Sequence, residues 1–565
     1  MKKTKNAWVL SFALGFVGRK QLRALNKAAK NCGKEQENTL RAILNYAKDT
    51  EWGKAHNFAK ILEAKDDKEL YKLWQENVPP ANDYEDLRPF IERHKNGEAN
   101  ILFPGKPLMY ATTSGTTKEP KWIPITQEYY SNVYSKMTHL WLYTFMMHRP
   151  KVWDGQCVSI VGKAIEGKAP DGTVYGSVSG VTQRDCPNFI KKLYSAPADV
   201  FAISDYTARY YTIMRTGIEQ NITLLVICNP STVIEMIKNA NEFYDQYVDD
   251  IEHGTLCKDM KIEPEIRAKM ESLYKPNPER AKELRALKEK YGTLLPKHYW
   301  PDLQVLTTWK CGNTKVYMDK FKGAFPDTML HQEFGYFASE CRFGLVLNGA
   351  DDTVMFPHFH YYEFVSVDEM ENPNPHFLQM NELEKGKRYL CYITTWAGLY
   401  RYNMNDMVEC TGYYKSIPTI QFIQKVNGII SMTGEKLAER QFIEAVKEAE
   451  KEANLPLKFY VGFAVVQESR YHFYFEFEDQ NVNQETADNF GKIVDKNLIK
   501  INCEYDAKRA SFRINEPVVH ILKKDSFETY KENCIAQGYR DGQFKINLLM
   551  QDEKRHSMFK ELIKK

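Results

Sequence analysis

The 565-residue sequence lacks several features that mark specialised classes of protein. Its 11 cysteines are scattered singly with no C-x-x-C pair, so neither a zinc site nor a disulfide framework is expected. Lys and Arg total 77 against 74 acidic residues, and this balance excludes a chain-wide basic surface for nucleic acid. No apolar run reaches the ~18 residues of a transmembrane helix. Reduced thiols and the missing membrane span predict a cytoplasmic protein.

Apolar residues make up 43% of the chain and aromatic residues 13%, which is enough for large buried cores. This composition excludes a disordered or fibrous protein. At about 100–200 residues per domain, the length predicts more than one folding unit. No internal repeat is visible, and no pattern indicates an oligomeric state.

The N-terminus combines positive charge with a short apolar run. The first 34 residues carry nine Lys or Arg and no acid, around the apolar stretch Ala7–Gly18. This stretch is too short to span ~30 Å of hydrocarbon, and no small-residue cleavage site follows it. We expect a helix packed on the body of the protein. A signal peptide and an interfacial basic helix that contacts a membrane surface stay open as alternatives.

The hydrophobic pattern changes twice along the chain. Residues 20–100 show the spacing of charged helices, whereas from about 108 to 430 short apolar strands alternate with helices. That alternation favours an α/β architecture with a substantially parallel sheet. Beyond a glycine-punctuated segment come helices and a few antiparallel strands. We predict a large domain over 1–426, a hinge over 427–434 and a small α+β domain over 435–565.

The segment Tyr110–Thr126, YATTSGTTKEPKWIPIT, is the first candidate for chemistry. A glycine lets backbone N–H groups approach a phosphate, and the hydroxyls around Gly115 are donors to phosphate oxygens. The segment is not the G-x-x-x-x-G-K-[ST] loop, because no lysine stands at the required offset. A threonine-rich turn between two strands explains the segment equally well.

Two further segments place a carboxylate next to a strand. Gly335–Gly344 reads GYFASECRFG, with Glu340 at a strand-to-loop boundary, and Thr394–Val408 reads TTWAGLYRYNMNDMV, with Asp406 after an aromatic and basic cluster. A carboxylate in such a position holds ribose hydroxyls in other nucleotide sites. In isolation each acid is better explained as a solvated loop or turn residue.

In this order and spacing, the three segments resemble the ANL superfamily of adenylate-forming enzymes, and within it the GH3 family of acyl acid–amido synthetases. The family's phosphate loop corresponds to residues 112–121, its Y-G-x-S-E motif to residues 336–340 and its R-Y-R-x-G-D motif to residues 401–406. The resemblance covers roughly residues 40–550. It implies a large α/β adenylate-forming domain with mixed or parallel sheets flanked by helices, and a small, mobile α+β C-terminal domain.

The sequence departs from the family pattern at four positions. Phe337 and Cys341 replace glycines of the second motif, and Asn403 and Asn405 replace Arg and Gly of the third. Asparagine tolerates the left-handed backbone, so Asn405 is expected to stand in for glycine. The lost arginine at 403 removes a cation, which Arg401 is expected to replace in part. A catalytically silent nucleotide-binding relative therefore stays an alternative.

The resemblance implies an ATP-dependent ligase with small-molecule substrates. A carboxylic acid attacks ATP to give an acyl adenylate and pyrophosphate, and an amino acid then forms an amide and releases AMP; transfer to coenzyme A is the near alternative. Glu340 is the expected Mg²⁺ ligand, and the expected catalytic set is Glu340, Lys436 and Lys545. The residues expected to bind nucleotide are Ser114, Gly115, Thr116, Thr117, Lys121, Tyr336, Ser339, Arg401 and Asp406.

Overall fold

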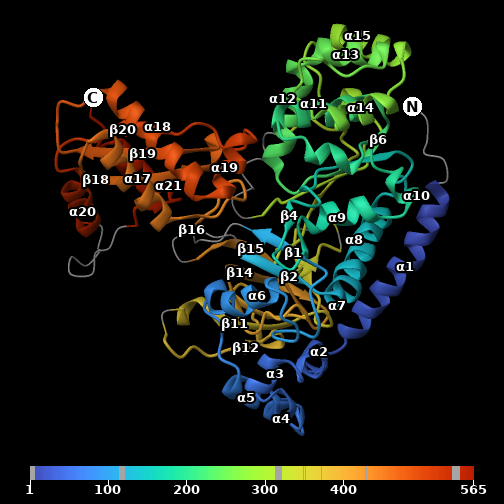
Figure 1. Cartoon of the computed structure of the whole chain (residues 1–565), viewed down its shortest axis with the longest axis vertical. Helices are drawn as coiled ribbons and strands as arrows, with labels where there is room; N and C mark the ends of the chain where they lie inside the picture. Colours follow the sequence, from blue (N-terminus) through green and yellow to red (C-terminus); the bar gives the residue numbers. More distant parts are fainter. Residues whose placement is uncertain are drawn as a thin grey trace. The chain divides into compact units, whose positions relative to one another are not determined.

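The computed structural model of this protein describes residues 7–113, 121–311, 318, 321–347, 349, 351–370, 372–426, 429–536 and 547–564. The chain divides into two compact units, with the boundary between Gln424 and Lys425 (Figure 1). Both units combine helices with sheets and the first is the larger, which confirms the predicted fold class. Among the described residues, no helix has both the length and the apolar character that crossing a membrane requires.

Six helices open the first unit, where the sequence predicts charged helices. They are α1 (Ala7–Ala28), α2 (Cys32–Ala47), α3 (Glu51–Ala55), α4 (Phe58–Leu62), α5 (Asp67–Asn77) and α6 (Arg88–Lys95). The side chains of Asn31, Thr50 and Asp66 cap α2, α3 and α5, because each accepts from the backbone N–H three residues on. Helix α1 lies alongside α8 (Ser135–His148), which confirms that the N-terminal helix packs on the body (Figure 1).

A parallel sheet of strand order β3-β6-β7-β8 forms the α/β part of this unit. Its strands are β3 (Gln156–Ser159), β6 (Ile222–Val226), β7 (Val305–Thr308) and β8 (Leu330–Glu333). Every residue of β7 is buried, as expected where helices cover a parallel sheet. The sheet shares a core with α11 (Tyr206–Glu219), α12 (Pro230–Glu242), α13 (Tyr244–His253), α14 (Pro264–Leu273) and α15 (Pro278–Tyr291).

The other sheets of the first unit are mainly antiparallel. The larger has the order β12-β11-β13-β14-β15-β10-β9 and the smaller β2-β1-β5-β4. The larger consists of β9 (Gly344–Leu345), β10 (Thr353–Met355), β11 (Tyr361–Ser366), β12 (Leu378–Gln379), β13 (Arg388–Thr394), β14 (Tyr402–Tyr414) and β15 (Ile417–Lys425). The smaller consists of β1 (Met109–Thr113), β2 (Lys121–Ile125), β4 (Gly167–Lys168) and β5 (Val174–Gly176). Four short α-helices also belong to this unit, namely α7 (Gln127–Tyr129), α9 (Val178–Asp185), α10 (Asn188–Lys191) and α16 (Pro296–Tyr299).

The second unit is an α+β fold. Its sheet has the order β20-β19-β18-β21, formed by β18 (Leu457–Val465), β19 (Arg470–Phe477), β20 (Val518–Ile521) and β21 (Leu549–Met550). A short pair, β16 (Ile429–Ile430) and β17 (Leu437–Ala438), precedes it. The helices are α17 (Glu439–Ala453), α18 (Gln484–Ile501), α19 (Cys503–Ala510), α20 (Ser526–Ala536) and α21 (Glu553–Lys560). Helices α17 and α18 pack against each other.

The close packing of α1 on α8 gives a matched pair of stability predictions. A Cβ at Gly18 would lie 2.3 Å from Tyr143 Cβ, so Gly18→Ala forces the helices apart and should lower the free energy of unfolding by about 1–3 kcal/mol. A Cβ at Gly15 would lie 3.4 Å from the flexible Met146 Cε, so Gly15→Ala should be neutral or stabilising by up to about 1 kcal/mol. Urea unfolding of both variants measures the difference, and equal effects would contradict the packing.

Candidate active site

The second and third sequence motifs meet in the interior of the first unit. The hydroxyl of Tyr336, which follows β8, donates to Asp406 Oδ2 on β14. Both side chains are buried, with 8% and 2% of their surface exposed. Burial, and then the carboxylate of Asp406, raise the pKa of Tyr336 well above its ordinary value, so the phenol stays protonated and serves as a donor. Two segments 70 residues apart are thus joined by one hydrogen bond.

Lys121 and Tyr402 extend this pair into a cluster. Lys121 Nζ, at the start of β2, donates to the hydroxyl of Tyr402 at 3.0 Å. Burial raises the pKa of Tyr402 well above its ordinary value, and the charges of Glu340 and Asp406 add to the effect. Both carboxylates therefore lie within electrostatic reach of this ring. We name Lys121, Tyr336, Glu340, Tyr402 and Asp406 the motif cluster.

A tight hairpin carries Glu340 and Ser339. Phe337 and Arg342 form an isolated antiparallel bridge, and the N–H of Ala338 donates to the carbonyl of Cys341 at 2.9 Å. Ser339 and Glu340 therefore occupy the tip of the turn. The side chain of Ser339 is exposed, whereas that of Glu340 is buried with 6% of its surface exposed. The hairpin thus turns the carboxylate of the second motif inward.

The strand that carries Asp406 has a bulge at this point. Leu390 pairs with Met407 and Tyr392 pairs with Asn403, so residues 404–406 of β14 lie opposite a single residue of β13. Bulges of this kind bend a strand and redirect its side chains next to active sites. The bulge places Asp406 where the regular ladder is interrupted.

Both asparagines that depart from the family pattern form hydrogen bonds at this bulge. Asn405 has a φ of 53°, which confirms the prediction that it stands in for a left-handed glycine. Its N–H donates to Asn403 Oδ1 at 2.9 Å, and Asn403 Nδ2 donates to the hydroxyl of Tyr392 at 3.1 Å. The two substitutions therefore support the local backbone of the third motif.

Arg401, an expected nucleotide contact, points into the interior instead. Its Nε donates to Glu363 Oε2 at 3.0 Å and its Nη1 to the carbonyl of Val78 at 2.8 Å. The arginine is 2% exposed and its φ is 45°, with the backbone N–H bonded to Thr394 Oγ1 at 3.0 Å. Because the guanidinium forms a buried ion pair, we infer that Arg401 stabilises the start of β14. That Arg401 also replaces part of the cation lost at position 403 stays a prediction.

Glu333 fixes the chain just before the hairpin. Its carboxylate ends β8 and accepts from the backbone N–H groups of Gly335 at 3.1 Å, Lys310 at 2.5 Å and Cys311 at 3.1 Å. The side chain is 3% exposed, and burial raises its pKa from 4.5 to about 7 despite these donors. Glu333 therefore joins the ends of β7 and β8 at the edge of the sheet that leads to Tyr336.

The remaining predicted residues fall in two groups. Lys436 lies in the second unit, after a turn in which the buried Glu435 accepts from the Tyr471 hydroxyl at 2.6 Å and from backbone N–H groups. The carbonyl of Lys436 accepts from Asn502 Nδ2 at 2.9 Å, so its backbone is firmly held. The others lie outside the described residues: Ser114, Gly115, Thr116, Thr117 and Lys545.

Sequence reasoning missed three residues of this region, namely Glu333, Glu363 and Tyr402. Glu363 is a single acid within the buried strand YYEFVS, and a buried charge requires a partner, so the sequence did contain a signal. Tyr402 and Met404 are the apolar residues of the alternating stretch YNMN, and this period of two predicts that they share the buried face of β14. Glu333 carries no such signal, because its partners are backbone groups.

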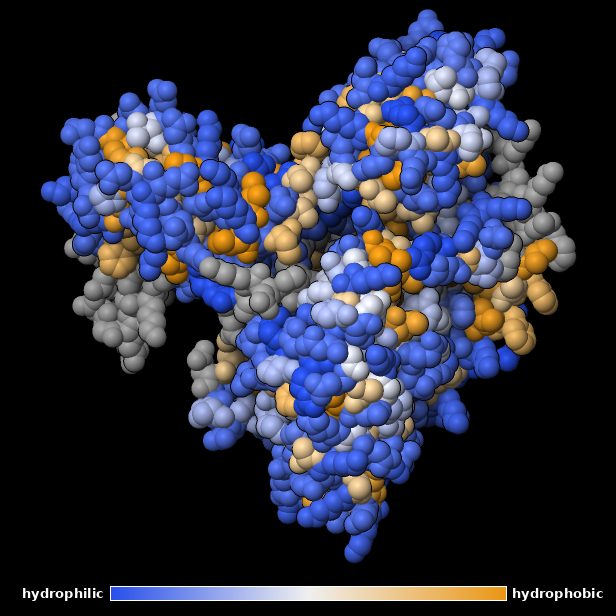
Figure 2. All heavy atoms as spheres, in the orientation of Figure 1, coloured by the Kyte–Doolittle hydropathy of each residue, from blue (hydrophilic) through white to orange (hydrophobic). Residues whose placement is uncertain are grey.

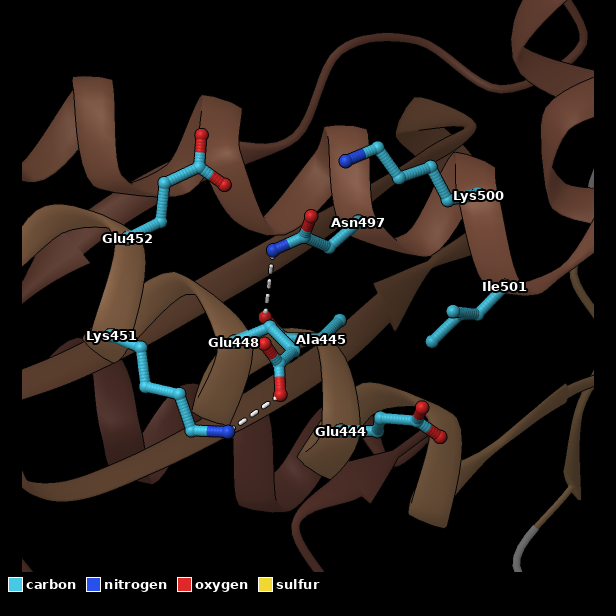
Figure 3. A pocket seen from close by; sticks show the side chains of 8 residues that line it. All are labelled: Glu444, Ala445, Glu448, Lys451, Glu452, Asn497, Lys500 and Ile501. Carbon is cyan, nitrogen blue, oxygen red and sulfur yellow. Dashed lines mark hydrogen bonds and ion pairs between the residues drawn. The ribbon is translucent and has the colours of Figure 1, made fainter.

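A pocket of about 420 Å³ lies between α17 and α18 of the second unit (Figure 3). Lys451 pairs with Glu448 of the same helix, α17, at 2.7 Å, and the Asn497 amide of α18 donates to the Ala445 carbonyl of α17 at 3.4 Å. Its lining is mainly charged, formed by Glu444, Ala445, Glu448, Lys451, Glu452, Asn497, Lys500 and Ile501. An acyl group requires mostly apolar walls, so we do not assign this pocket to the substrate.

The raised pKa of Glu333 predicts a specific dependence of stability on pH. The folded state holds this proton more tightly than the unfolded chain, so ionisation costs nothing below pH 4.5 and destabilises the fold progressively as the pH rises to about 7. Relative to Glu333→Gln, the wild type should lose about 3 kcal/mol of unfolding free energy over this range. Unfolding at a series of pH values, with the exposed Glu384→Gln as control, measures it. Parallel curves for wild type and Glu333→Gln would contradict it.

Comparison with known proteins identifies relatives that match most of this chain. Jasmonoyl–L-amino acid synthetase JAR4 of Nicotiana attenuata is 24% identical over 546 residues, covering 91% of each chain. Indole-3-acetic acid-amido synthetase GH3.3 of Arabidopsis thaliana is 24% identical over 563 residues, covering 93% of this chain and 91% of its own. The solved structure of GH3.15 acyl acid amido synthetase has a TM-score of 0.63 and 20% identity over 96% of both chains, which shows a shared fold.

The family models account for most of the sequence. The GH3 family N-terminal domain matches residues 21–330, the central domain residues 353–425 and the C-terminal domain residues 440–554. These matches include the residues of the motif cluster other than Tyr336 and Glu340, which stand between the first two domains. The chain therefore belongs to the GH3 family.

Proposed function

We propose that this chain is an ATP-dependent ligase that joins a carboxylic acid to an amino acid through an acyl adenylate. The names of its relatives, a jasmonoyl–L-amino acid synthetase and an indole-3-acetic acid-amido synthetase, support this reaction class. The observation that carries the proposal is the motif cluster, in which a lysine, two carboxylates and two tyrosines from three separate segments are brought together.

In the proposed first step, a carboxylate oxygen of the acid attacks the α-phosphorus of ATP. The bond to pyrophosphate breaks, and pyrophosphate leaves with its electron pair. Such a step needs positioning and neutralised charge more than covalent help from the protein. The Lys121 ammonium, held by the Tyr402 hydroxyl, supplies positive charge. We keep Ser114, Gly115, Thr116 and Thr117 as proposed phosphate-binding residues, and Ser339 as a nucleotide contact at the exposed tip of the hairpin.

The two carboxylates of the motif cluster, Glu340 and Asp406, have different proposed roles. Glu340 would hold a Mg²⁺ ion, because such a hard cation takes one or two carboxylates plus water. Bound there, Mg²⁺ would neutralise part of the phosphate charge. Asp406 is proposed to accept from the ribose hydroxyls. The Tyr336 hydroxyl, bonded to Asp406 Oδ2, orients that carboxylate.

In the proposed second step, the amine nitrogen attacks the acyl carbon. The amide bond forms as the acyl–phosphate bond breaks, the nitrogen loses its proton, and AMP leaves with the electron pair. Lys436 and Lys545 are kept, on the family resemblance, as positive charges for the leaving phosphate, with residues 427–434 as the hinge of a mobile C-terminal domain. We also propose a cytoplasmic location, supported by cysteines that are scattered singly along the sequence with no C-x-x-C pair.

Pyrophosphate release tests this function. Wild type is incubated with ATP, Mg²⁺ and a panel of aromatic and aliphatic carboxylic acids, with and without mixed amino acids. We expect acid-dependent release that falls by at least about a hundredfold in Glu340→Ala and Asp406→Ala, because the first removes the proposed Mg²⁺ ligand and the second the proposed ribose contact that positions ATP. The exposed Glu384→Ala, whose carboxylate pairs with surface Lys387, is the matched control and should keep full activity.

The products separate the alternatives. Amide products with an amino acid support the proposal. Thioester products formed only with coenzyme A would instead identify the chain as an acyl-CoA ligase. ATP binding without pyrophosphate release from any acid would indicate a silent relative. Loss of activity in Glu384→Ala as well would show that the cluster is not specifically required.

The hydrogen bond between Lys121 and Tyr402 gives a subtler prediction. Tyr402→Phe keeps the buried ring but removes the hydroxyl that holds the lysine, and a hydrogen bond to a charged group contributes about 1.5–3 kcal/mol. We expect kcat/KM for ATP to fall by roughly tenfold or more, with Tm little changed. Tyr413→Phe on the same strand, whose hydroxyl bonds only to the Leu383 carbonyl among the described residues, should have no effect. Equal kinetics for both variants would exclude this role of Tyr402.

A further inference from the structure

The N-terminal half of α1 is apolar on two faces, and only one of them packs against the rest of the chain that the structure describes. On the inner face, Leu14, Gly15 and Gly18 are buried. Gly18 lies so close to Tyr143 of α8 that no Cβ would fit between them. A helix needs a single apolar stripe to pack on a protein body. The inner stripe accounts for the packing, and the outer face requires a separate explanation.

The outer face presents large apolar side chains to solvent. Val9, Phe12 and Phe16 are 42%, 76% and 70% exposed. Their spacing of three and four residues places them on one side of the helix. Met147 of α8 is 44% exposed. The residue before it, Met146, lies beside Gly15 of α1, since its Cε would be 3.4 Å from a Cβ added there. Figure 2 shows hydrophobic surface along the outer side of this helix, and a continuous exposed patch of this kind marks an interaction site.

The same outer face becomes basic toward the C-terminal half of α1. Arg19, Lys20, Arg23 and Lys27 are exposed and continue the spacing of the apolar residues. The first 34 residues contain nine basic residues and no acid. The neighbouring α8 contains no acidic residue either. The apolar patch is therefore bordered by positive charge that no nearby acid of these two helices balances.

We propose that the outer face of α1 docks on the surface of an anionic lipid bilayer. Val9, Phe12 and Phe16 would enter the boundary between headgroups and acyl chains, and the basic residues would contact lipid phosphates. An amphipathic helix with aromatic residues and a cationic polar region has this mode of binding. The helix lies in the plane of the surface rather than across it, since it is too polar to span.

Charge complementarity favours lipid over a second copy of this chain. Parallel pairing of two α1 helices would place the basic residues of both copies against each other. Antiparallel pairing would place Phe12 and Phe16 of one copy against Arg19, Lys20 and Arg23 of the other, with no acid to compensate. A bilayer provides both an apolar layer and a negative surface, and so matches both parts of the face.

Vesicle flotation of the full chain tests the proposal. Wild type is mixed with vesicles of phosphatidylcholine that contain about 30 mol% phosphatidylglycerol, and separately with neutral phosphatidylcholine vesicles. We expect binding to the anionic vesicles that weakens with salt and is at least about tenfold stronger than binding to neutral ones. Phe12→Ser/Phe16→Ser and Lys20→Gln/Arg23→Gln should each reduce the partition coefficient by about tenfold or more.

A control variant keeps the test specific. Leu273→Ser/Phe512→Ser removes two apolar side chains of 57% and 52% exposure elsewhere on the molecule and should bind as wild type does. All substituted residues are exposed, so Tm should stay unchanged and a folding defect can be recognised. Absence of flotation with anionic vesicles overturns the proposal, as does undiminished binding by Phe12→Ser/Phe16→Ser. A lipid-free dimer that this variant converts to monomer would assign the face to a second copy instead.

Discussion

The buried ion pair between Arg401 and Glu363 is the interaction on which the candidate site depends. A paired charge in the interior is tolerated only with good geometry and further hydrogen bonds, and here the Val78 carbonyl and the Trp74 indole supply them. The pair fixes the first residue before β14 in a left-handed conformation. Because β14 then starts at Tyr402, the same constraint determines where this ring meets Lys121 and where Asp406 meets its partner.

Much of this arrangement was predictable from the sequence, and the reasons are local. A carboxylate beside a strand marked the segments that carry Tyr336 and Asp406 as candidates, and the resemblance to the GH3 family assigned them to a nucleotide site. The left-handed backbone of Asn405 followed from the intrinsic tolerance of asparagine. The fold class followed from the alternation of apolar periods. Each of these inferences uses information contained within a few consecutive residues.

The parts that were not predictable depend on contacts between distant segments. Arg401 reads as a nucleotide contact in the motif, yet its partner Glu363 lies 38 residues away on another strand. The inward turn of Glu340 depends on a hairpin whose preceding strand is held by Glu333 through backbone groups, which leave no trace in the sequence pattern. Likewise, the apolar run of α1 could not be divided into an inner and an outer face before α8 was placed beside it.

The four carboxylates of this region have two kinds of role: Glu333 and Glu363 stabilise the fold, and Glu340 and Asp406 are proposed to act in the reaction. The carboxylate of Glu363 forms an ion pair with a guanidinium, and the oxygens of Glu333 accept hydrogen bonds from backbone N–H groups. Both carboxylates therefore stabilise the fold. Asp406 is oriented instead by a neutral phenol, which directs the carboxylate without cancelling its charge. Glu340 is buried in the same cluster. Negative charge is costly to keep in a buried position, and Glu340 and Asp406 are the two carboxylates that the proposed function uses, one for a magnesium ion and one for the ribose hydroxyls.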